Sequence, residues 1–243
     1  MEYLHWHETT ITDFSEKNVA HMYANGYVFT RIGKGVMHQT RSVRVDLSKF
    51  ELSSENRRIL KKVGERDGGS TVPVMALQLS VVPFAGYDFT IGKLAKDFYE
   101  EKFGSGIMSA QKVKEMLTEP ARSNFNLLLR YTISGITTQK DMTPPSLGYA
   151  IAYENPLLLH YSYPFYDLKS APKDMGLGMM IMAIEHAKAA GKKYAYLGSL
   201  QRPGDTYKLQ FSGLEWYDGG PGGSHAWRTD LEMAKEILKH EPA

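Results

Sequence analysis

Residues suited to acyl transfer from a phosphate-bearing carrier are concentrated in residues 147–219. Gly176-Leu177-Gly178 opens a predicted helix, and the free N–H groups at the start of a helix favour an anion such as a phosphate. After the next predicted strand, a polar loop leads to Tyr207-Lys208-Leu209-Gln210-Phe211, which supplies a phenol and an ammonium group. The segment therefore predicts a transferase whose function depends on the carrier of the acyl group.

The elements around these residues predict an α/β (α+β) fold with a mixed, largely antiparallel sheet flanked by helices. Residues 147–153 and 157–163 are β-favouring runs separated by Glu154-Asn155-Pro156, as in an antiparallel hairpin. A helix over 178–190 and strands over 194–198 and 213–217 follow, and the capping box Thr229-Asp230-Leu231-Glu232 opens a last helix. The earlier part predicts helices over 13–24, 54–63, 90–103 and 109–117 and strands over 27–32, 43–47, 74–82 and 124–134.

The polar, proline-bearing segment 137–146 predicts a loop or linker and a soft boundary between two halves, 1–140 and 141–243, of one compact unit. With 243 residues and 42% hydrophobic content, the chain can bury a substantial core. It has no apolar run of about 20 residues and no N-terminal secretory signal, so we expect a cytoplasmic protein without a membrane partner. The absence of cysteine excludes disulfides and thiolate metal sites, and no histidine spacing predicts a metal.

A basic segment stands out against a net charge of only +2. Residues 31–66 contain ten Arg and Lys and four acids, an excess of +6, so the remainder carries 2 − 6 = −4. In the predicted helix 54–63, Ile59, Leu60 and Val63 share one face and the opposite face is basic. Like charges four residues apart are unfavourable unless an anion lies nearby, and an RNA backbone supplies one; a merely solvated face is the alternative. The predicted anion-binding side chains are Arg57, Arg58, Lys61 and Lys62.

In their order along the chain, several segments resemble the arginyl and leucyl transferases, which pass an amino acid from charged tRNA to a protein N-terminus. The catalytic half of that family is similar to the GNAT acyltransferase fold, so the resemblance implies a GNAT-like sheet and leaves open two GNAT-like halves. The chain lacks the cysteine cluster that members usually carry, here at residues 37–41, and its loop 199–206 is short. The matching segments are Arg44-Val45-Asp46, residues 50–59, Pro164-Phe165-Tyr166-Asp167, Gly176-Leu177-Gly178, residues 194–198, and Tyr207-Lys208 through Phe211 to Leu214-Glu215.

For that reaction, an aminoacyl ester is already activated, so the site must hold the amine near the carbonyl, stabilise the oxyanion and assist the leaving oxygen. Lys208 would neutralise charge, Tyr207 would donate to the leaving oxygen, and Asp167 would accept from the attacking ammonium. Packing is the alternative for Tyr166 and Tyr207, and a turn cap is the alternative for Asp167. The expected catalytic residues are Tyr166, Asp167, Tyr207 and Lys208, and the expected substrate or tRNA contacts, besides the basic helix, are Arg44, Gly176, Gly178, Gly198, Ser199, Gln210 and Trp216.

Two other functions fit the same residues. Lys173-x-x-Gly176-x-Gly178 is close to the pyrophosphate motif of acetyl-CoA-dependent GNAT enzymes, although close packing of the helix on the sheet also explains the glycines. A non-catalytic RNA-binding protein is the second alternative. The main hypothesis needs no cofactor, with aminoacyl-tRNA as co-substrate and a protein or peptide N-terminus as acceptor; acetyl-CoA enters only in the first alternative.

Overall fold

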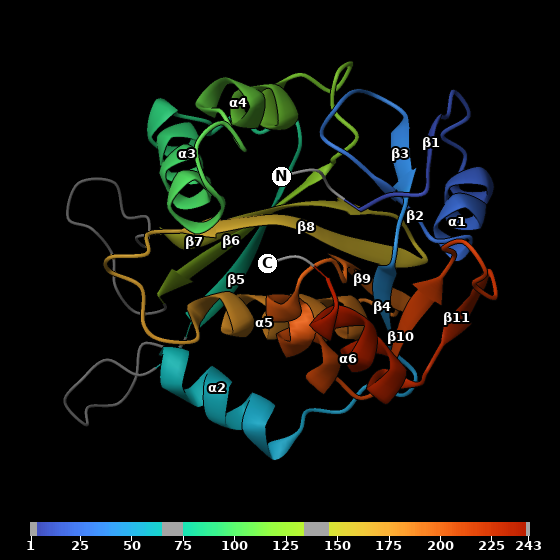
Figure 1. Ribbon diagram of the computed structural model, residues 1–243. Coiled ribbons are helices and arrows are strands. Elements are labelled where there is room, and N and C mark those ends of the chain that lie inside the picture. Colours follow the sequence, from blue (N-terminus) through green and yellow to red (C-terminus); the bar gives the residue numbers. More distant parts are fainter. Residues whose placement is uncertain (1–3, 65–74, 134–145, 242–243) are drawn as a thin grey trace. The chain divides into compact units, whose positions relative to one another are not determined.

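The computed structural model describes residues 4–64, 75–133 and 146–241 and has the predicted α/β class, with mostly antiparallel sheet flanked by helices (Figure 1). The described helices are α1 (Glu16–Ala24), α2 (Ser54–Gly64), α3 (Phe89–Phe103), α4 (Ala110–Thr118), α5 (Met175–Ala189), α6 (Leu231–Lys239) and the 3-10 helix η1 (Pro203–Gln210). The described strands are β1 (His7–Thr10), β2 (Tyr27–Phe29), β3 (Val36–Gln39), β4 (Ser42–Asp46), β5 (Met75–Val81), β6 (Leu127–Ile133), β7 (Ser146–Glu154), β8 (Leu158–Tyr166), β9 (Tyr194–Ser199), β10 (Leu214–Asp218) and β11 (Ala226–Arg228).

The chain divides into two compact units made of interleaved segments rather than two consecutive halves. Both β8 and α5 contribute residues to each unit. The predicted boundary at residues 140 and 141 lies outside the described residues. Unit 1 comprises Met1–Ser53, Glu154–His160 and His186–Ala243, and unit 2 comprises Ser54–Tyr153 and Tyr161–Glu185.

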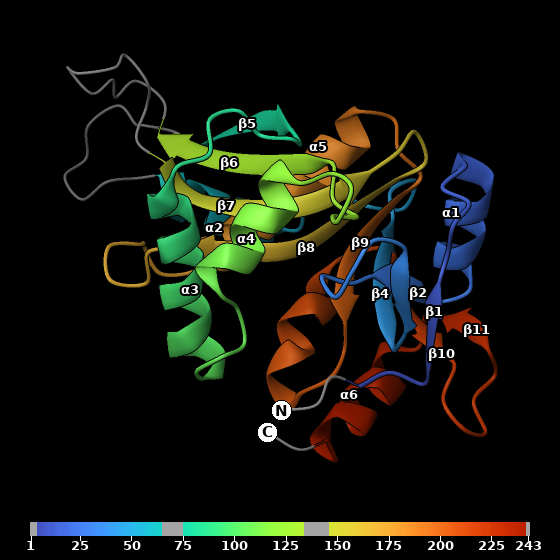
Figure 2. The same ribbon diagram turned by 90° about the horizontal axis from the view of Figure 1, so that it is seen from above.

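Unit 2 is a sheet covered by helices on both faces. Its strand order is β8-β7-β6-β5, and both the β5–β6 and the β6–β7 pairs are antiparallel. Helices α3 and α4 lie on one face of this sheet, and α2 and the first part of α5 lie on the other (Figures 1 and 2). The predicted helix starts are confirmed by their caps, since Asp88 accepts from the Thr90 N–H at 2.6 Å and Ser109 accepts from the Lys112 N–H at 3.0 Å. The predicted hairpin is confirmed as well, because β7 and β8 are neighbours joined by a connection too short for a parallel crossover.

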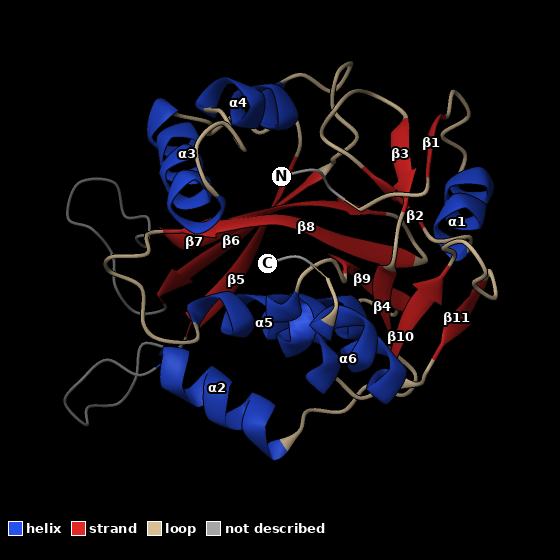
Figure 3. Cartoon of the chain, viewed as in Figure 1, coloured by secondary structure: helices blue, strands red, loops and turns tan. Residues whose placement is uncertain are grey.

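Unit 1 contains two sheets. The larger has the order β11-β10-β4-β9-β8, in which only the start of β8 pairs with β9, in parallel, from Leu158–Tyr194 to His160–Tyr196. The smaller sheet has the order β1-β3-β2 (Figure 3). The predictions of β2 and β4 are confirmed, whereas β1, β3, β11 and η1 were not predicted. These elements are short, and β3 is paired on both sides by strands that are themselves only three or four residues long, so its sequence carries little periodicity.

Among the described helices, none combines the length and the apolar composition needed to cross a membrane. The most apolar helix, α5, has 15 residues, which is short of the roughly 20 residues that span a bilayer. Its Met179, Ile181, Ala183 and Ile184 are completely buried, so the apolar composition of α5 belongs to the protein core.

Candidate functional site

Tyr166 and Asp167 line a pocket of about 710 Å³ in unit 2, a size typical of small-ligand sites. The pocket lies between α3, strands β6 and β7, and the residues that follow β8. Its aromatic lining consists of Phe98, Tyr149 and Tyr166, and the ring centroids of Phe98 and Tyr166 lie 4.9 Å apart. The structure therefore brings two of the four predicted catalytic residues into one concave site.

Arg130 is the cation that β6 presents to this pocket. Side chains alternate between the two faces of a strand, and the Tyr131 hydroxyl donates to the Met179 carbonyl of α5 at 2.9 Å, so Arg130 points to the face of α3 and α4. In the β6–β7 register Arg130 is opposite Tyr149, which lines the same pocket. Its Nε is buried and has no hydrogen-bond partner among the described residues. The pocket thus has a guanidinium group with unused donors.

Most of the acids that line the pocket have partners within the protein. Asp88 caps α3, and Asp97 is paired with Lys93 at 2.5 Å. Asp167 accepts from the Lys169 N–H at 3.0 Å and from the Ser170 hydroxyl at 2.7 Å, and the bond from Ser170 holds the pKa of Asp167 below its usual value. Asp167 therefore caps the turn after β8 as an exposed, ionised carboxylate. Glu101, at the end of α3, completes the acidic lining.

The glycines at the start of α5 predicted an anion-binding helix N-terminus, but the groups there already bind each other or other parts of the protein. The Gly178 N–H is used within the helix, where it donates to the Asp174 carbonyl at 2.9 Å. The Asp174 carboxylate precedes the helix and is paired with Lys62 of α2 at 2.7 Å, and that bond lowers the pKa of Asp174. An acid already occupies the position where a helix N-terminus would favour a pyrophosphate.

Gly178 serves close packing. A Cβ atom added there would lie 2.6 Å from Cγ2 of Val63 in α2, whereas one added at Gly176 would lie 3.2 Å from the Tyr166 hydroxyl. We expect Gly178→Ala to lower the free energy of unfolding by about 1–2 kcal/mol, because overpacking costs more than the helix propensity of alanine returns. Urea unfolding should show this loss, and Val63→Ala in the same chain should remove most of it. Equal stability of Gly178→Ala and wild type would contradict the packing role.

Helix α2 has the amphipathic arrangement that was predicted. Ile59 and Val63 are buried and Leu60 is half-buried, while Arg57 and Lys61 are exposed on the other side. The repulsion expected between Arg58 and Lys62 is relieved within the protein. Arg58 forms two hydrogen bonds to Glu55, at 2.5 and 2.7 Å, and Lys62 binds Asp174. Arg57 is therefore the strongest candidate of the four for an anion contact.

The remaining predicted catalytic residues lie in unit 1, where β9 ends and η1 follows. Between the pairs Ser42–Ser199 and Arg44–Tyr196, β9 has one residue more than β4, which is a β-bulge. Gly198 lies in this bulge with a φ of +81°, a conformation that favours glycine. The position of an added Cβ at Gly198 has no atom within 4 Å. The bulge takes residues out of the regular hydrogen-bond ladder at Gly198, which was predicted together with Ser199 as a substrate or tRNA contact.

Lys208 is a buried residue that stabilises the turn between β9 and η1. Its ammonium donates to the Ser199 carbonyl at 2.7 Å and is paired with Asp205 at 3.2 Å. Asp205 also accepts from the backbone N–H groups of Gln201 and Arg202 at 2.9 and 3.1 Å, which closes the turn after β9. Lys208 therefore positions the Ser199 backbone, rather than standing free for a developing charge. Nearby, Tyr207 is 44% exposed, and Gln210 donates to the Tyr207 carbonyl at 2.6 Å.

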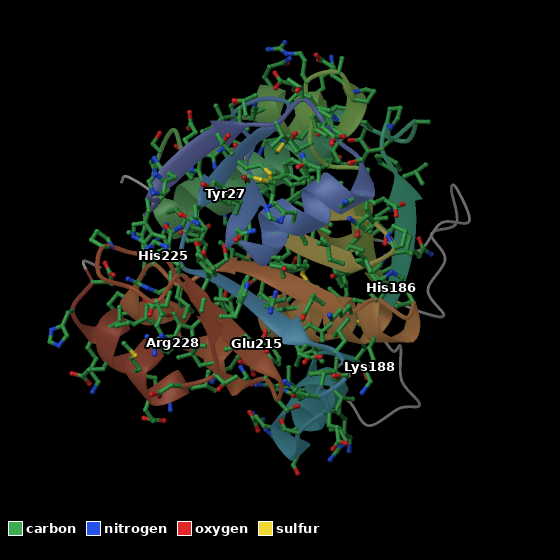
Figure 4. The ribbon with its side chains drawn as sticks, turned by 90° about the vertical axis from the view of Figure 1, so that its right-hand side faces the viewer. Tyr27, His186, Lys188, Glu215, His225 and Arg228 are labelled. Atoms are coloured by element: carbon green, nitrogen blue, oxygen red, sulfur yellow. The ribbon has the colours of Figure 1, made fainter. Side chains whose placement is uncertain are left out.

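Two predicted binding residues need correction. Trp216 is completely buried in β10 and its indole N–H donates to the Asp230 carbonyl at 2.9 Å, so no ring face is open for stacking on a base. The Arg44 guanidinium lies 2.7 Å from Glu215 and is enclosed between the rings of Tyr194 and Trp227, at 3.9 and 3.8 Å from their centroids. Glu215, labelled in Figure 4, comes from β10, next to β4 in the sheet. The guanidinium of Arg44, a predicted substrate or tRNA contact, is therefore already bound by a residue of the chain itself.

Arg130 was not predicted as a site residue. Its signal was present, because a lone arginine interrupts the apolar strand Leu127–Ile133, and charged residues are rarely buried without a partner. In residues 4–64, 75–133 and 146–241, no three His, Asp or Glu side chains are grouped in a way that could hold a metal ion.

Comparison with known proteins gives a curated relative. A protein named aspartate/glutamate leucyltransferase, from Dinoroseobacter shibae (strain DSM 16493 / NCIMB 14021 / DFL 12), is 29% identical over 186 residues. The match covers 74% of this chain and 60% of the relative, so the chain corresponds to little more than half of that protein. No protein-family model matches the chain.

Solved structures give looser likenesses. The C-terminal domain of a lysylphosphatidylglycerol synthetase from Agrobacterium fabrum is 16% identical with a TM-score of 0.40, over 79% of this chain and 54% of that one. The structure of L-PGS from Bacillus licheniformis is 13% identical with a TM-score of 0.46, over 92% of this chain and 69% of that one.

Proposed function

We propose that this chain is an aminoacyltransferase that moves an amino acid from charged tRNA to the α-amine of a protein or peptide. The observation that carries the proposal is the 29% identity to a leucyltransferase over 186 residues. The exposed cations Arg57 and Lys61 on α2 support it, because they offer a contact for an RNA backbone. Leucine is the first donor to test, since the relative is named for leucyl transfer, and arginine is the second.

The chemistry of this reaction asks for positioning rather than for a strong base. A peptide α-amine has an ordinary pKa of about 7.7 to 8.0, so part of it is neutral near physiological pH. In unit 2, Asp167 adds an exposed, ionised carboxylate to the pocket while it caps the turn after β8. In unit 1, Lys208 holds the Ser199 carbonyl at 2.7 Å, which fixes the backbone next to the bulge at Gly198. Tyr207, which follows the same turn, is exposed.

Transfer of a labelled amino acid tests the proposal. Purified chain is incubated with tRNA charged with radiolabelled leucine or arginine and with peptides that begin with Asp, Glu, Lys or Arg. We expect label in at least one peptide, and none when the peptide N-terminus is acetylated. Absence of label in all combinations, with charged tRNA shown to be intact at the end, would reject the function.

The basic face of α2 predicts a charge-dependent contact with tRNA. We expect Arg57→Glu with Lys61→Glu to weaken tRNA binding by at least tenfold at moderate salt and to flatten the plot of log affinity against log salt. Filter binding across salt concentrations measures both effects. Lys102→Glu with Lys114→Glu, which changes the charge equally on α3 and α4, is the matched control. Equal affinities for the two double variants would assign the basic face to solvent.

Acetyl-CoA as the acyl carrier is less well supported. The residue pattern Lys173-x-x-Gly176-x-Gly178 favoured it, but Asp174 places a carboxylate at the same helix start and Gly178 faces Val63. A rise in melting temperature with acetyl-CoA, and none with tRNA, would reverse this preference. Binding of tRNA without transfer of any amino acid would favour the non-catalytic RNA-binding function.

A further inference from the structure

Strand β5 is the last strand of the sheet in unit 2, and among the described residues no strand lies on its outer side (Figure 2). All seven of its residues pair with β6 without a shift in register, from Met75–Ile133 to Val81–Leu127. An exposed edge strand can pair with another chain, and proteins usually prevent this with charged residues, prolines or bulges in the strand. None of these three features occurs in β5. The edge is therefore suited to accept a further strand.

The backbone groups that face the outer side of β5 belong to alternate residues. Just beyond the strand, the Val82 N–H donates to the Asn126 carbonyl at 3.0 Å, in the same register as the β5–β6 pairs. Because the direction of hydrogen bonding alternates along a strand, the even-numbered residues of β5 point their N–H and C=O groups to β6. The N–H and C=O groups of the odd-numbered residues, from Met75 to Val81, therefore point to the outer side.

The side chains of the same odd-numbered residues form an apolar strip on one face of the sheet. Leu77 is opposite Tyr131, whose hydroxyl donates to α5, so the strip lies on the face that α2 and the first part of α5 cover (Figure 1). The cover does not extend along the whole strand, since Met75 is 4% exposed whereas Leu79 and Val81 are 45% and 75% exposed. An exposed apolar surface thus lies beside the outward-facing backbone groups.

The absence of charge at this edge favours a second copy of the chain as the occupant. No residue from Met75 to Tyr87 is charged. Two copies related by a twofold axis place the same surface on both sides of the interface, so any charge near the axis would face its own like charge. A strand from a different protein could instead carry the opposite charge. A neutral edge is therefore what pairing between identical strands requires.

We propose that β5 pairs antiparallel with β5 of a second copy, around a twofold axis at Gln78. Gln78 is the central residue of the strand, so this register places Leu79 opposite Leu77 of the copy and Val81 opposite Met75 of the copy. All four are odd-numbered residues, so their outward-facing N–H and C=O groups form the hydrogen bonds of the new pair. The apolar side chains of the copy then cover Leu79 and Val81, and the sheets of the two copies become continuous.

A single introduced cysteine tests both the pairing and its register, because the chain has no cysteine of its own. At the axis the two copies of residue 78 form a non-hydrogen-bonded pair with Cα atoms about 4.5 Å apart, a separation that a disulfide can bridge. We expect Gln78→Cys to form a covalent dimer under mild oxidation. Ser80→Cys is the matched control, because its two copies are offset by four residues, about 13 Å, and should stay monomeric in a denaturing gel. A mixture of Ser80→Cys and Ala76→Cys, which lie opposite each other, should crosslink.

Lysine substitution in the apolar strip provides a second measurement. Sedimentation equilibrium of the full chain over a range of concentrations gives the dissociation constant of the dimer. We expect Leu79→Lys with Val81→Lys to raise that constant at least about tenfold, because it replaces apolar contacts by like charges near the axis. Ile32→Lys with Met233→Lys, at residues of unit 1 that are 59% and 39% exposed, is the matched control and should dimerise like the wild type. Melting temperatures check that the variants are folded.

The outcomes separate a second copy from other occupants of the edge. A chain that stays monomeric at every concentration and shows no Gln78→Cys crosslink would overturn the proposal and assign the edge to a strand of another protein or of the chain itself. A dimer that the lysines of the strip leave unchanged would place the interface elsewhere. Equal crosslinking of Gln78→Cys and Ser80→Cys would contradict the register. None of these measurements uses tRNA, so their results do not depend on the proposed function.

Discussion

Replacement of Arg44 by methionine is expected to lower the free energy of unfolding by about 3–5 kcal/mol, the cost of breaking a buried ion pair by removing one partner. Arg44 Nε and Nη2 lie 2.8 and 2.7 Å from one carboxylate oxygen of Glu215, and both side chains are mostly buried, at 9% and 13% exposed. Methionine retains apolar volume between Tyr194 and Trp227 but leaves the Glu215 charge without its main partner. Urea unfolding followed by tryptophan fluorescence measures the loss.

Two further variants separate the ion pair from the packing. Arg44→Met with Glu215→Gln removes both charges, and we expect it to recover much of the stability lost in Arg44→Met. Arg44→Lys keeps the charge but loses the flat surface that stacks between two rings, so its stability should fall between wild type and Arg44→Met. If Arg44→Met unfolded like wild type and only lost transfer activity, Arg44 would be a substrate-binding residue after all.

The free energy of unfolding is expected to fall as the pH falls from 7 to 5, because His160 is kept neutral in the folded protein. Burial lowers the pKa of His160 to about 3, from an ordinary value of 6.5, and its Nδ1 lies 2.9 Å from the Tyr23 hydroxyl. Since the folded pKa is the lower one, the unfolded chain takes up the proton first. The stabilisation is complete above pH 6.5 and is lost progressively towards pH 3. At about 1.4 kcal/mol per pH unit, this group alone accounts for roughly 2 kcal/mol by pH 5.

Substitution of His160 isolates this contribution from other titrating groups. His160→Gln keeps an acceptor for the Tyr23 hydroxyl but cannot take up a proton, so its unfolding free energy should fall by about 2 kcal/mol less than that of wild type between pH 7 and 5. Tyr23→Phe is the matched control, because it removes the hydrogen bond and leaves the imidazole buried. Its pH dependence should remain that of wild type, although its stability is lower at every pH. Identical pH slopes for wild type and His160→Gln would contradict the account.

The elements that could be predicted from the sequence are those whose apolar residues recur at regular spacing and whose ends are marked by particular residues. Helices α3 and α4 were predicted within one residue of their observed bounds, because their apolar residues recur at helical spacing and Gly104 and Pro120 mark their ends. The short strands β1, β3 and β11 escaped prediction because three or four residues carry too little pattern and depend on pairing with distant segments. The composition of the two units could not be predicted either, because each unit joins segments that lie far apart in the sequence.

The sequence predicted some of the residues that lie at the candidate site better than it predicted what each of them binds. Tyr166 and Asp167 were expected in a site and do line a pocket, whereas Arg130, on the same pocket, went unnoticed because it lies within an apolar strand. Lys208 was expected to act on a developing charge, but burial commits its ammonium to the Ser199 carbonyl. Residue type indicates what a side chain can bind, and burial decides whether its partner is a ligand or the protein.

The mass of an acceptor peptide after incubation with charged tRNA tests the central claim most directly. If the chain is an aminoacyltransferase, a peptide with a free α-amine gains the mass of one amino acid residue, and fragmentation places that residue at the N-terminus. The gain requires both the chain and intact aminoacyl-tRNA, and N-acetylated peptide remains unchanged. A peptide of unaltered mass with leucyl- and arginyl-tRNA, across acidic and basic N-terminal residues, would contradict the account.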